Sequence, residues 1–546
     1  MMRSIKIFTF IPLLLGLLLN GSSFPDTDFN VYDKANQPVG LAATPRGETL
    51  LLEGSDSSNP RDYDPATIVS NGARTLLLFS GLVSYNQQLQ LVPEIAESWD
   101  ISADGTIYTF KIRENAKFQD GKDISAQDFI YSWERAASPK TNSSTAATYL
   151  SDIVGVKEML SGEADHISGL QAVDDHTLQV TIDAPKSYFL YKLVYPTAYV
   201  VDKENVESGD DWYKRPNGSG AYRLKEWKPF VYSLYEINPY YYLDSPAIRY
   251  ITIKQETGSL LSYENNSTDI HYVGLANLER VLDPKEPMHQ DLVSDVDLCT
   301  GYISFDVNQP PFDDVKVRQA FTLAFDRQKY IHVVLHDASL PAKGLYPPAL
   351  PGYNTQLKTL DYDPDQAKRL LTESKYGSAA GLPPITFTQG GLGYYVNSET
   401  AAMVQMWQQN LGITINIESI DSNNYYDEIY SGNHGQIIGN GWCADYPDPE
   451  NFADVLFHSG NSNNLSNYSN PDLDKLLEDA RVEQDTEKRI QMYQQAEQII
   501  VDDAPALFTT HSLSYQVVKP YIKGYVLTPI DFPFVRYLSI DASLLP

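Results

Sequence analysis

Basic residues are scarce in this sequence. Its 546 residues include 41 lysines and arginines against 71 aspartates and glutamates, which gives a formal net charge of −30 at pH 7. Such a charge repels phosphate backbones and anionic lipid head groups, so we expect no nucleic-acid partner. Ordinary exported proteins carry similar balances. We therefore interpret the acidity as favouring solubility and not as an indication of substrate.

The sequence also lacks the common catalytic signatures. It contains no H-E-x-x-H motif, no G-x-S-x-G motif and no P-loop. His332 and His336 have the spacing of one helical turn and could face a metal, but two ligands without a third make a weak site. Acidic pairs such as Asp313 and Asp314 suit a glycosidase but arise by chance among so many acids, and Asp313 is better placed to begin a helix. We expect no catalytic residue, no metal and no cofactor.

Only one hydrophobic run has the character of a targeting segment. Arg3 and Lys6 precede "IFTFIPLLLGLLL", and small polar residues follow it, which is the layout of a secretory signal peptide over residues 1–23. A membrane anchor is the alternative, although the run is short for a span of about 20 residues. "LLNGS" is similar to a lipobox but has Ser22 at the position of the acylated cysteine, so a lipid anchor is doubtful. Residues 24–47 are polar and aperiodic, and we predict a flexible leader.

Cysteine is nearly absent, since Cys299 and Cys443 are the only two. An isolated pair in an exported chain is more often bridged than free, because the compartment is oxidising. Two buried thiols are the alternative. A bridge between positions so far apart in the chain would stabilise the fold by at most about 5 kcal/mol in the chain-entropy model.

Strand and helix patterns alternate along the chain. Residues 108–113 alternate apolar and polar side chains, as in a half-buried strand, and Ser125 with Asp128 forms a capping-box pattern before a helix. The helical pattern at residues 398–411 passes through a glycine into an alternating strand at residues 413–419. This alternation predicts an α/β fold, and the length of the chain predicts two or three lobes.

The stretch "GWCADYPDPENF" at residues 441–452 combines an indole, a thiol and a carboxylate within five residues. If Cys443 is bridged, Asp445 lies two residues from a fixed point and is held rigidly. The simpler alternative is that Asp445 caps a turn before Pro447 while Trp442 fills the core.

Five stretches identify a family resemblance when they are taken in order. They are "LVPEIAESW" with "YTFKIRENAKFQDGKDISAQDFIYSWERA", "AVDDHTLQVTI", "NGSGAYRLKEW" with "INPYYYLDSPAI", "FDDVKVRQAFTLAFDRQKYI", and "GWCADYPDPENF". Over nearly its whole length after residue 48, the chain resembles the oligopeptide-binding proteins of bacterial ABC importers, within the peptide and nickel family of extracytoplasmic solute-binding proteins. Cys299 and Cys443 match the positions of the disulfide in the oligopeptide branch, so the resemblance implies that they are bridged.

The resemblance implies a two-lobed α/β clamp of the periplasmic-binding-protein type (type II-like), with an extra subdomain. Lobe I would comprise residues 48–85, 218–290 and 512–546. Residues 86–217 would form the appended subdomain, and residues 291–511 would form lobe II.

The resemblance also implies a ligand site. In this family the carboxylate at the position of Asp445 takes the N-terminal ammonium of a peptide. The backbone of Gly441, Trp442 and Cys443 pairs with the extended ligand, and Trp442 could wall the cleft with its apolar face.

Two further features bear on this expected site. The segment "DYDPATIVSNGAR" is similar to the one that crosses the ligand from the facing lobe, so we expect contacts from Val69 and Asn71, with Val69 in place of an acidic residue of the family. Some oligopeptide binders carry an arginine shortly before the Gly-Trp pair. This chain has Gly439 and Asn440 there, so the resemblance does not extend to an anchor for the C-terminus of the ligand.

The implied function is that of a receptor, not an enzyme. It would bind oligopeptides between its lobes and deliver them to an ABC permease and its ATPase subunits. We expect a monomer in the periplasm or at the outer face of the cytoplasmic membrane. Two alternatives remain: the same fold could bind an oligosaccharide, which 38 tyrosines would allow, or a metal chelate; or the chain could be a secreted hydrolase.

Overall fold

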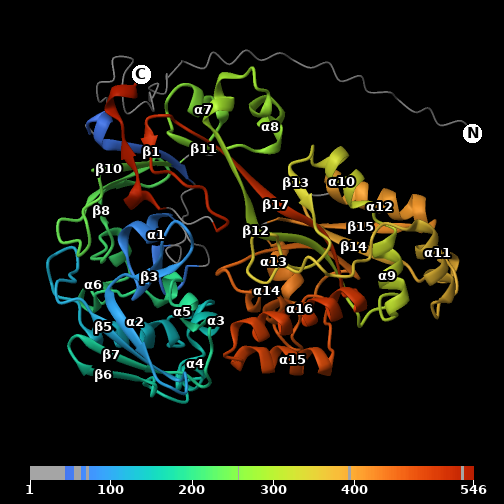
Figure 1. Ribbon diagram of the computed structural model, residues 1–546, viewed down its shortest axis with the longest axis horizontal. Helices are drawn as coiled ribbons and strands as arrows, with labels where there is room; N and C mark the ends of the chain where they lie inside the picture. The colour runs from blue at the N-terminus through green and yellow to red at the C-terminus, as the bar shows by residue number, and fades with distance from the viewer. Residues whose placement is uncertain are drawn as a thin grey trace, which may run out of the picture. The chain divides into compact units, whose positions relative to one another are not determined.

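The computed structural model of the chain describes residues 44–54, 63–68, 73–255, 258–391, 395–422, 424–530 and 534–546. The predicted signal peptide, most of the predicted leader, and the expected contacts Val69 and Asn71 lie outside these ranges. Gly47–Pro546 forms one unit by its internal contacts, and this unit has a mixed α/β composition, as predicted (Figure 1). Among the described residues, no helix has both the length and the hydrophobicity needed to span a bilayer.

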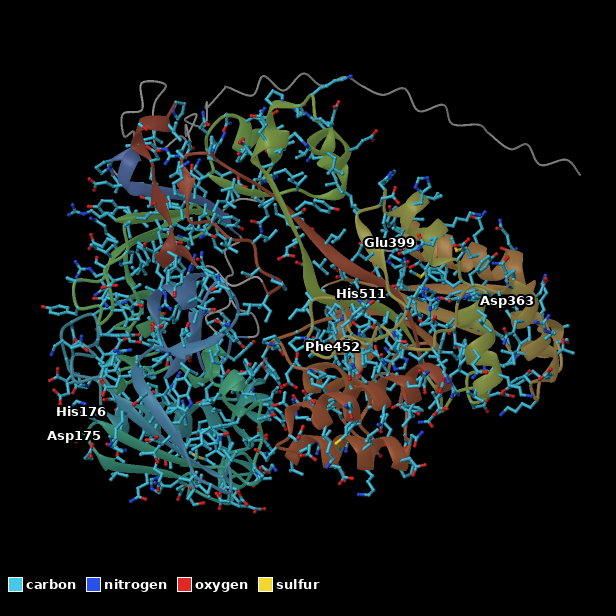
Figure 2. The ribbon with its side chains drawn as sticks, in the orientation of Figure 1. Asp175, His176, Asp363, Glu399, Phe452 and His511 are labelled. Carbon is cyan, nitrogen blue, oxygen red and sulfur yellow. A yellow bond between two sulfur atoms is a disulfide. The ribbon has the colours of Figure 1, made fainter. Side chains whose placement is uncertain are left out.

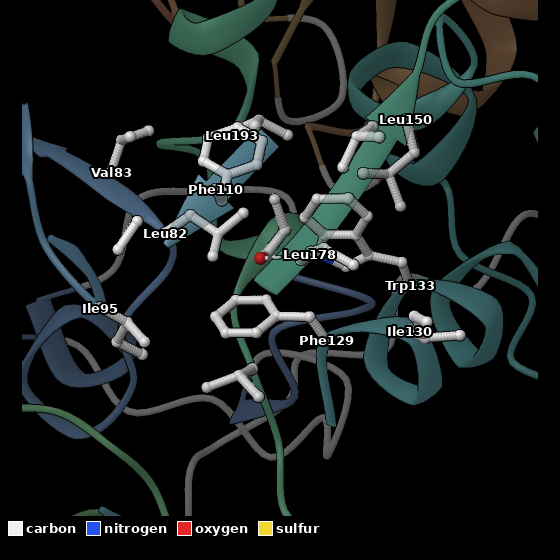
Figure 3. Close-up of a cluster of buried hydrophobic side chains, with 14 of the residues drawn as sticks. Leu82, Val83, Ile95, Phe110, Phe129, Ile130, Trp133, Leu150, Leu178 and Leu193 are labelled. Carbon is white, nitrogen blue, oxygen red and sulfur yellow. Dashed lines mark hydrogen bonds between the residues drawn. The ribbon is translucent and has the colours of Figure 1, made fainter. Parts of the chain in front are cut away.

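One four-stranded sheet is formed by a single continuous part of the chain, residues 96–181. Its four antiparallel strands have the order β4 (Ala96–Ile101), β5 (Ile107–Ile112), β7 (Thr177–Thr181) and β6 (Leu170–Asp174). Helix α2 (Ala126–Ala137) packs on this sheet and begins as predicted, because the backbone N–H of Ser125 donates to the Asp128 carboxylate at 2.8 Å. Phe129 and Trp133 of α2 meet Phe110 of β5 in a buried cluster (Figure 3).

A second sheet is built from two distant parts of the chain. Strands β1 (Thr49–Gly54) and β10 (Tyr250–Gln255) are parallel, and β9 (Tyr232–Ile237) and β8 (Tyr222–Lys228) continue the sheet in antiparallel pairing. Its core includes Leu50 and Tyr222, together with Tyr521 and Val535 from near the C-terminus. Separate segments therefore share one core, and this core also includes Tyr199, Val201 and Trp212 from the predicted subdomain. The boundaries of lobe I stay a prediction.

The largest sheet has seven strands. The main path is β11 (Ile270–Tyr272), β17 (Ala506–Val518), β12 (Leu292–Phe305), β16 (Ile437–Cys443), β14 (Ile385–Gly390) and β15 (Ile415–Ile420), and β13 (Ser339–Pro341) pairs with β17. The long strands β12 and β17 are antiparallel neighbours, and Figure 1 shows them side by side. The boundary that we propose at 511/512 lies within β17, and the one at 290/291 lies just before β12, so these two strands would join the lobes.

Two separate hydrophobic cores accompany this sheet. One contains Phe321 and Trp407 with helices α9 to α12, and the other contains Phe452 and Tyr493 with helices α14 to α16. Helix α12 ends at Gly412, whose φ of 71° a glycine adopts easily, and the chain then enters β15, as predicted. Small two-stranded sheets are formed by β2 (Val83–Tyr85) with β3 (Leu91–Pro93) and by β18 (Ile522–Lys523) with β19 (Ser539–Ile540).

The remaining helices are α1 (Ala73–Leu78), α3 (Ala146–Leu150), α4 (Val156–Leu160), α5 (Phe189–Lys192), α6 (Lys203–Val206), α7 (Leu260–Glu264), α8 (Leu275–Leu282), α9 (Val315–Leu323), α10 (Arg327–Val334), α11 (Pro364–Glu373), α12 (Ser398–Leu411), α13 (Tyr425–Tyr430), α14 (Glu450–Phe457), α15 (Pro471–Val482) and α16 (Thr486–Asp503).

Two local predictions were wrong. Helix α10 ends at Val334, and His336 has a positive φ of 50°, so His332 and His336 do not share a helix face. His332 instead lies 3.0 Å from the Asp337 carboxylate. The N-cap of α9 is Asp314, which accepts the Lys316 N–H at 2.9 Å, and not Asp313, whose carboxylate accepts the Tyr376 hydroxyl at 2.6 Å.

Candidate ligand-binding site

Strand β16 brings the predicted site residues to the sheet. It runs antiparallel to β12, with Cys443 directly opposite Cys299 and Gly441 opposite Gly301. Cys299 and Cys443 form a disulfide, as predicted. Gly441, Trp442 and Cys443 are therefore the last residues of a strand and not part of a loop, and the carboxylate of Asp445 follows two residues beyond the disulfide.

The edge of β16 that faces away from β12 is not paired with another described strand at Gly441, Trp442 and Cys443. Strand β14 pairs with β16 only at Ile437 and Ile438, and no described strand continues that pairing toward Cys443. On the β12 side, the Ala444 N–H donates to the Leu298 carbonyl at 2.8 Å. Antiparallel residues alternate in direction, so the backbone groups of Gly441 and Cys443 point away from β12. The side chain of Asn440 accepts the Gly441 N–H at 2.8 Å, which leaves the Gly441 carbonyl and both groups of Cys443 facing the open edge.

Asn451 orients both Trp442 and Asp445. Its side-chain oxygen accepts the indole N–H of Trp442 at 3.2 Å and the backbone N–H of Asp445 at 2.9 Å. The ring of Trp442 is partly buried and packs against the core that contains Phe452. The end of β16 and the following turn are thus held by one amide from the first turn of α14.

The Asp445 carboxylate makes no ion pair with any residue that the structure describes. Burial raises its pKa above the ordinary value, and contacts with Tyr149 and Asn451 offset part of that rise. Tyr149 and Tyr195 come from a distant part of the chain, and their rings stack with centroids 3.7 Å apart. Burial raises the pKa of both hydroxyls, and the charge of Asp445 adds to the rise. A carboxylate without a cation therefore faces a pair of tyrosines.

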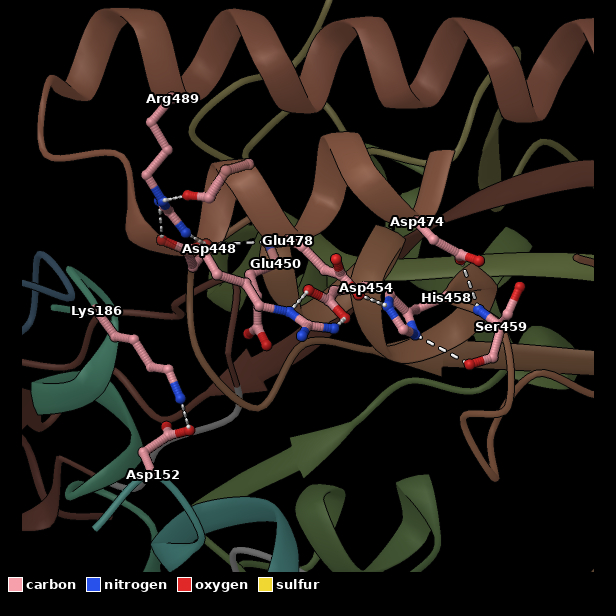
Figure 4. A network of polar contacts seen from close by, with 12 residues as sticks. Asp152, Lys186, Asp448, Glu450, Asp454, His458, Ser459, Asp474, Glu478 and Arg489 are labelled. Atoms are coloured by element: carbon pink, nitrogen blue, oxygen red, sulfur yellow. Dashed lines mark hydrogen bonds and ion pairs between the residues drawn. The ribbon is translucent and has the colours of Figure 1, made fainter. Parts of the chain in front are cut away.

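Several buried charges follow Asp445 and are fully paired (Figure 4). Arg489 of α16 donates to both oxygens of Asp448, at 2.7 and 2.8 Å, and Arg481 does the same for Asp454, at 2.6 and 2.7 Å. The partners lie too far apart in the chain for a local sequence pattern to reveal them. The Asp448 pair fixes the turn after Asp445 to α16, and the Asp454 pair fixes α14 to α15.

Glu450 is the exception within this network. It is buried, accepts the Tyr446 hydroxyl, and has no ion pair within contact distance among the described residues. Burial raises its pKa to about 7; the positive charge of Lys192 opposes this rise, and the negative charge of Asp454 adds to it. Sequence reasoning missed this residue because its environment depends on Lys192, which lies in α5.

Comparison with known proteins places these features in a family. The model of "Bacterial extracellular solute-binding proteins, family 5 Middle" matches residues 90–464, which is more than half of the chain. The chain belongs to this family. The periplasmic oligopeptide-binding protein OppA of Salmonella typhimurium is 31% identical to this family 5 protein over 536 residues, which cover 93% of this chain and 95% of the relative.

Solved structures show the same fold. The murein tripeptide binding protein MppA of Escherichia coli has a TM-score of 0.76 at 29% identity, covering 91% of this chain and 99% of that chain. OppA of Haemophilus influenzae in complex with RPPGFSPFR has a TM-score of 0.74 at 25% identity, with coverages of 91% and 99%. These likenesses confirm the predicted two-lobed α/β clamp for this family 5 protein. The individual lobe boundaries and the roles of the site residues stay predictions.

Proposed function

We propose that this family 5 protein is an exported receptor that binds oligopeptides between its lobes and delivers them to an ABC permease. The observation that carries the proposal is the Asp445 carboxylate, which has no ion pair among the described residues and lies next to the open edge of β16. A peptide offers the complement of both features at once, because it has an ammonium group at one end and an extended backbone behind it.

A partly buried carboxylate without a cation beside it is unfavourable, and an ammonium group that donates to it forms a short, charge-assisted hydrogen bond. The free backbone groups of Gly441 and Cys443 can then hydrogen-bond an added strand, which gives affinity without selecting particular side chains. Trp442 would contribute an apolar wall. Val69 and Asn71, which lie outside the described residues, stay predicted contacts from the facing lobe.

The names of the relatives support the ligand and the location. OppA is named a periplasmic oligopeptide-binding protein and MppA a murein tripeptide binding protein, so both names indicate a peptide ligand, and the name of OppA also indicates the periplasm. For this chain we propose export to the periplasm, action as a monomer without enzymatic turnover, and delivery to a permease with ATPase subunits. An oligosaccharide or a metal chelate is not favoured, since neither presents the ammonium group that Asp445 would complement.

Native mass spectrometry of the protein purified without refolding tests the proposal. We expect a series of co-purified adducts that release short peptides of mixed sequence, and fewer adducts on an Asp445→Asn variant. Asp365→Asn, at an exposed position in the first turn of α11, is the matched control and should retain the adducts. A single non-peptide ligand, or turnover of a peptide or glycoside by the purified protein, would overturn the proposal.

A further inference from the structure

We propose that a pocket beside the open edge of β16 binds the side chain of a lysine or arginine of the peptide, with Glu399 as its counter-charge. This inference rests on the proposed function and names the ligand chemistry that the site selects.

The pocket has a volume of about 400 Å³ and is lined by Gly439, Asn440 and Gly441 of β16. The same strand residues therefore border both the open edge and the pocket. Strands β12, β13, β14 and β17 and helices α10, α12 and α13 supply the other walls, and Glu399 lies in the first turn of α12 (Figure 2). A side chain that leaves a peptide paired with β16 would enter this space.

The two glycines create the space. Neither Gly439 nor Gly441 has a positive φ, so the backbone conformation does not require glycine at either position. A Cβ atom at Gly439 would lie 3.5 Å from the ring of Phe387, and one at Gly441 would lie 3.6 Å from the Thr300 carbonyl, which are ordinary contacts. Larger residues would fit there but would fill the pocket. The glycines thus leave volume for a ligand side chain.

The charge of the pocket selects a cation. Glu399 is the only charged residue among the described residues that line it. The sequence has no lysine or arginine between Lys375 and Lys475, the stretch that supplies β14, α12, α13 and β16. The Glu399 side chain is exposed, and its carboxylate makes no hydrogen bond or ion pair with any described residue, so it is available to a ligand. A carboxylate of the ligand would meet repulsion here, whereas an ammonium or guanidinium group would be attracted.

Aromatic residues line the same pocket as Glu399. Five of the lining residues are aromatic: Tyr302, Tyr330, Phe387, Tyr425 and Tyr426. The Tyr425 hydroxyl donates to the Gly439 carbonyl at 2.7 Å, and the rings of Tyr425 and Tyr426 are nearly perpendicular with centroids 5.5 Å apart. Such fixed ring faces attract cations, and their apolar surface suits the methylene stem of lysine or arginine.

The strand register limits which residue of the peptide reaches the pocket. In an antiparallel pairing each ligand residue opposes one residue of β16. If the first ligand residue lies opposite Asp445 or Cys443, Gly441 opposes the fifth or the third. The pocket therefore accepts a side chain at about the third to fifth position of the peptide.

Isothermal titration calorimetry with substituted penta-alanine tests this inference. Lysine, norleucine or glutamate is placed in turn at positions three, four and five. At one of these positions we expect lysine to bind about tenfold or more tightly than norleucine, and glutamate to bind most weakly. Glu399→Gln should reduce the ratio of lysine to norleucine affinity severalfold, and Gly439→Met should reduce it by filling the pocket. The control Glu487→Gln removes an exposed carboxylate outside the pocket and should keep the wild-type ratio.

The outcomes separate this inference from the proposed function. Equal affinities for lysine and norleucine at all three positions, or a ratio that Glu399→Gln leaves unchanged, would overturn the pocket assignment while peptide binding itself stands. If no peptide binds, including penta-alanine, the proposed function fails and the role of the pocket fails with it.

Discussion

At the scale of single residues, Asp445 is a carboxylate whose surroundings disfavour its charge. Burial raises its pKa, and no described cation opposes the rise. If the ligand ammonium binds the ionised form, affinity is complete above this raised pKa and falls as the pH drops through it, because protonation removes the partner charge. Asp445→Asn should weaken binding by about 2–5 kcal/mol at neutral pH and flatten the pH profile.

Calorimetry from neutral to acidic pH measures both effects of this substitution. The peptide has no acidic or histidine side chain and an amidated C-terminus, so that no group of the peptide titrates between neutral and acidic pH. A variant with the same pH profile as the wild type would show that another group controls binding.

Glu450 gives a separate prediction about stability. Its pKa rises from 4.5 to about 7 on folding, so the folded state keeps a proton that the unfolded chain loses. The associated stability is present below about pH 4.5 and is lost as the pH rises toward 7. Glutamine does not titrate, so the Glu450→Gln variant does not lose this stability as the pH rises. We expect the free energy of unfolding of the variant, relative to the wild type, to increase between pH 5 and pH 8 by up to about 3 kcal/mol.

Urea denaturation of both proteins at the two pH values measures this difference. If the free energies of unfolding of the wild type and the variant change in parallel with pH, the pKa of Glu450 is not raised on folding and the prediction is wrong.

These residues differ in how far sequence could reveal them. Asp445 can be singled out from the sequence because the family resemblance includes the contiguous stretch with Trp442 and Cys443, and its role as an anchor stays a prediction. Glu450 lies in the same stretch, but its pKa is raised by burial and by the charge of Asp454, against the opposing charge of Lys192 from a distant helix, and no local pattern reveals that environment. Glu399 has no motif around it, and only the fold places it beside Gly439.

At the scale of elements, the disulfide ties the end of β16 to β12. Replacing both Cys299 and Cys443 by serine should lower the free energy of unfolding by at most about 5 kcal/mol in the chain-entropy model. Peptide affinity should also fall, because Asp445 follows this bond by two residues and loses its fixed position. Denaturation and calorimetry of the double variant measure the two effects.

A reducing agent provides the control for the disulfide prediction. Reduction should shift the wild type toward the stability of the double variant and leave the variant unchanged. Equal stability of the wild type and the double variant would contradict the prediction.

The periodicity of apolar residues predicts where helices and strands lie better than it predicts where they begin and end. It predicted α2, α12 and β15, where apolar spacing and capping residues agree. It placed the start of α9 one residue early because Asp313 is engaged by Tyr376, far along the chain. It extended α10 to His336, which has a left-handed backbone conformation that ends the helix. Tertiary contacts and single backbone angles decide such ends.

At the scale of the whole molecule, the clamp fold followed from a resemblance spread along the chain, and local patterns alone gave only the α/β class. A peptide that contacts both lobes would favour the closed arrangement by its differential affinity. The stacked rings of Tyr188 and Tyr446, with centroids 6.5 Å apart, already join the proposed subdomain to the proposed lobe II. We expect the radius of gyration from small-angle X-ray scattering to decrease when peptide is added.

The control for the scattering measurement is the Asp445→Asn variant, which should show little change at the same peptide concentration. An unchanged radius of gyration in a wild-type sample that calorimetry shows to be saturated would contradict closure on the ligand.

The most direct test of the account compares one peptide with a free N-terminus and the same peptide after N-acetylation, by calorimetry on the wild-type protein. The account predicts that acetylation weakens binding by about 2–5 kcal/mol, because it removes the ammonium group that Asp445 pairs with. Equal affinities for the two peptides would contradict the assignment of Asp445 as the N-terminal anchor.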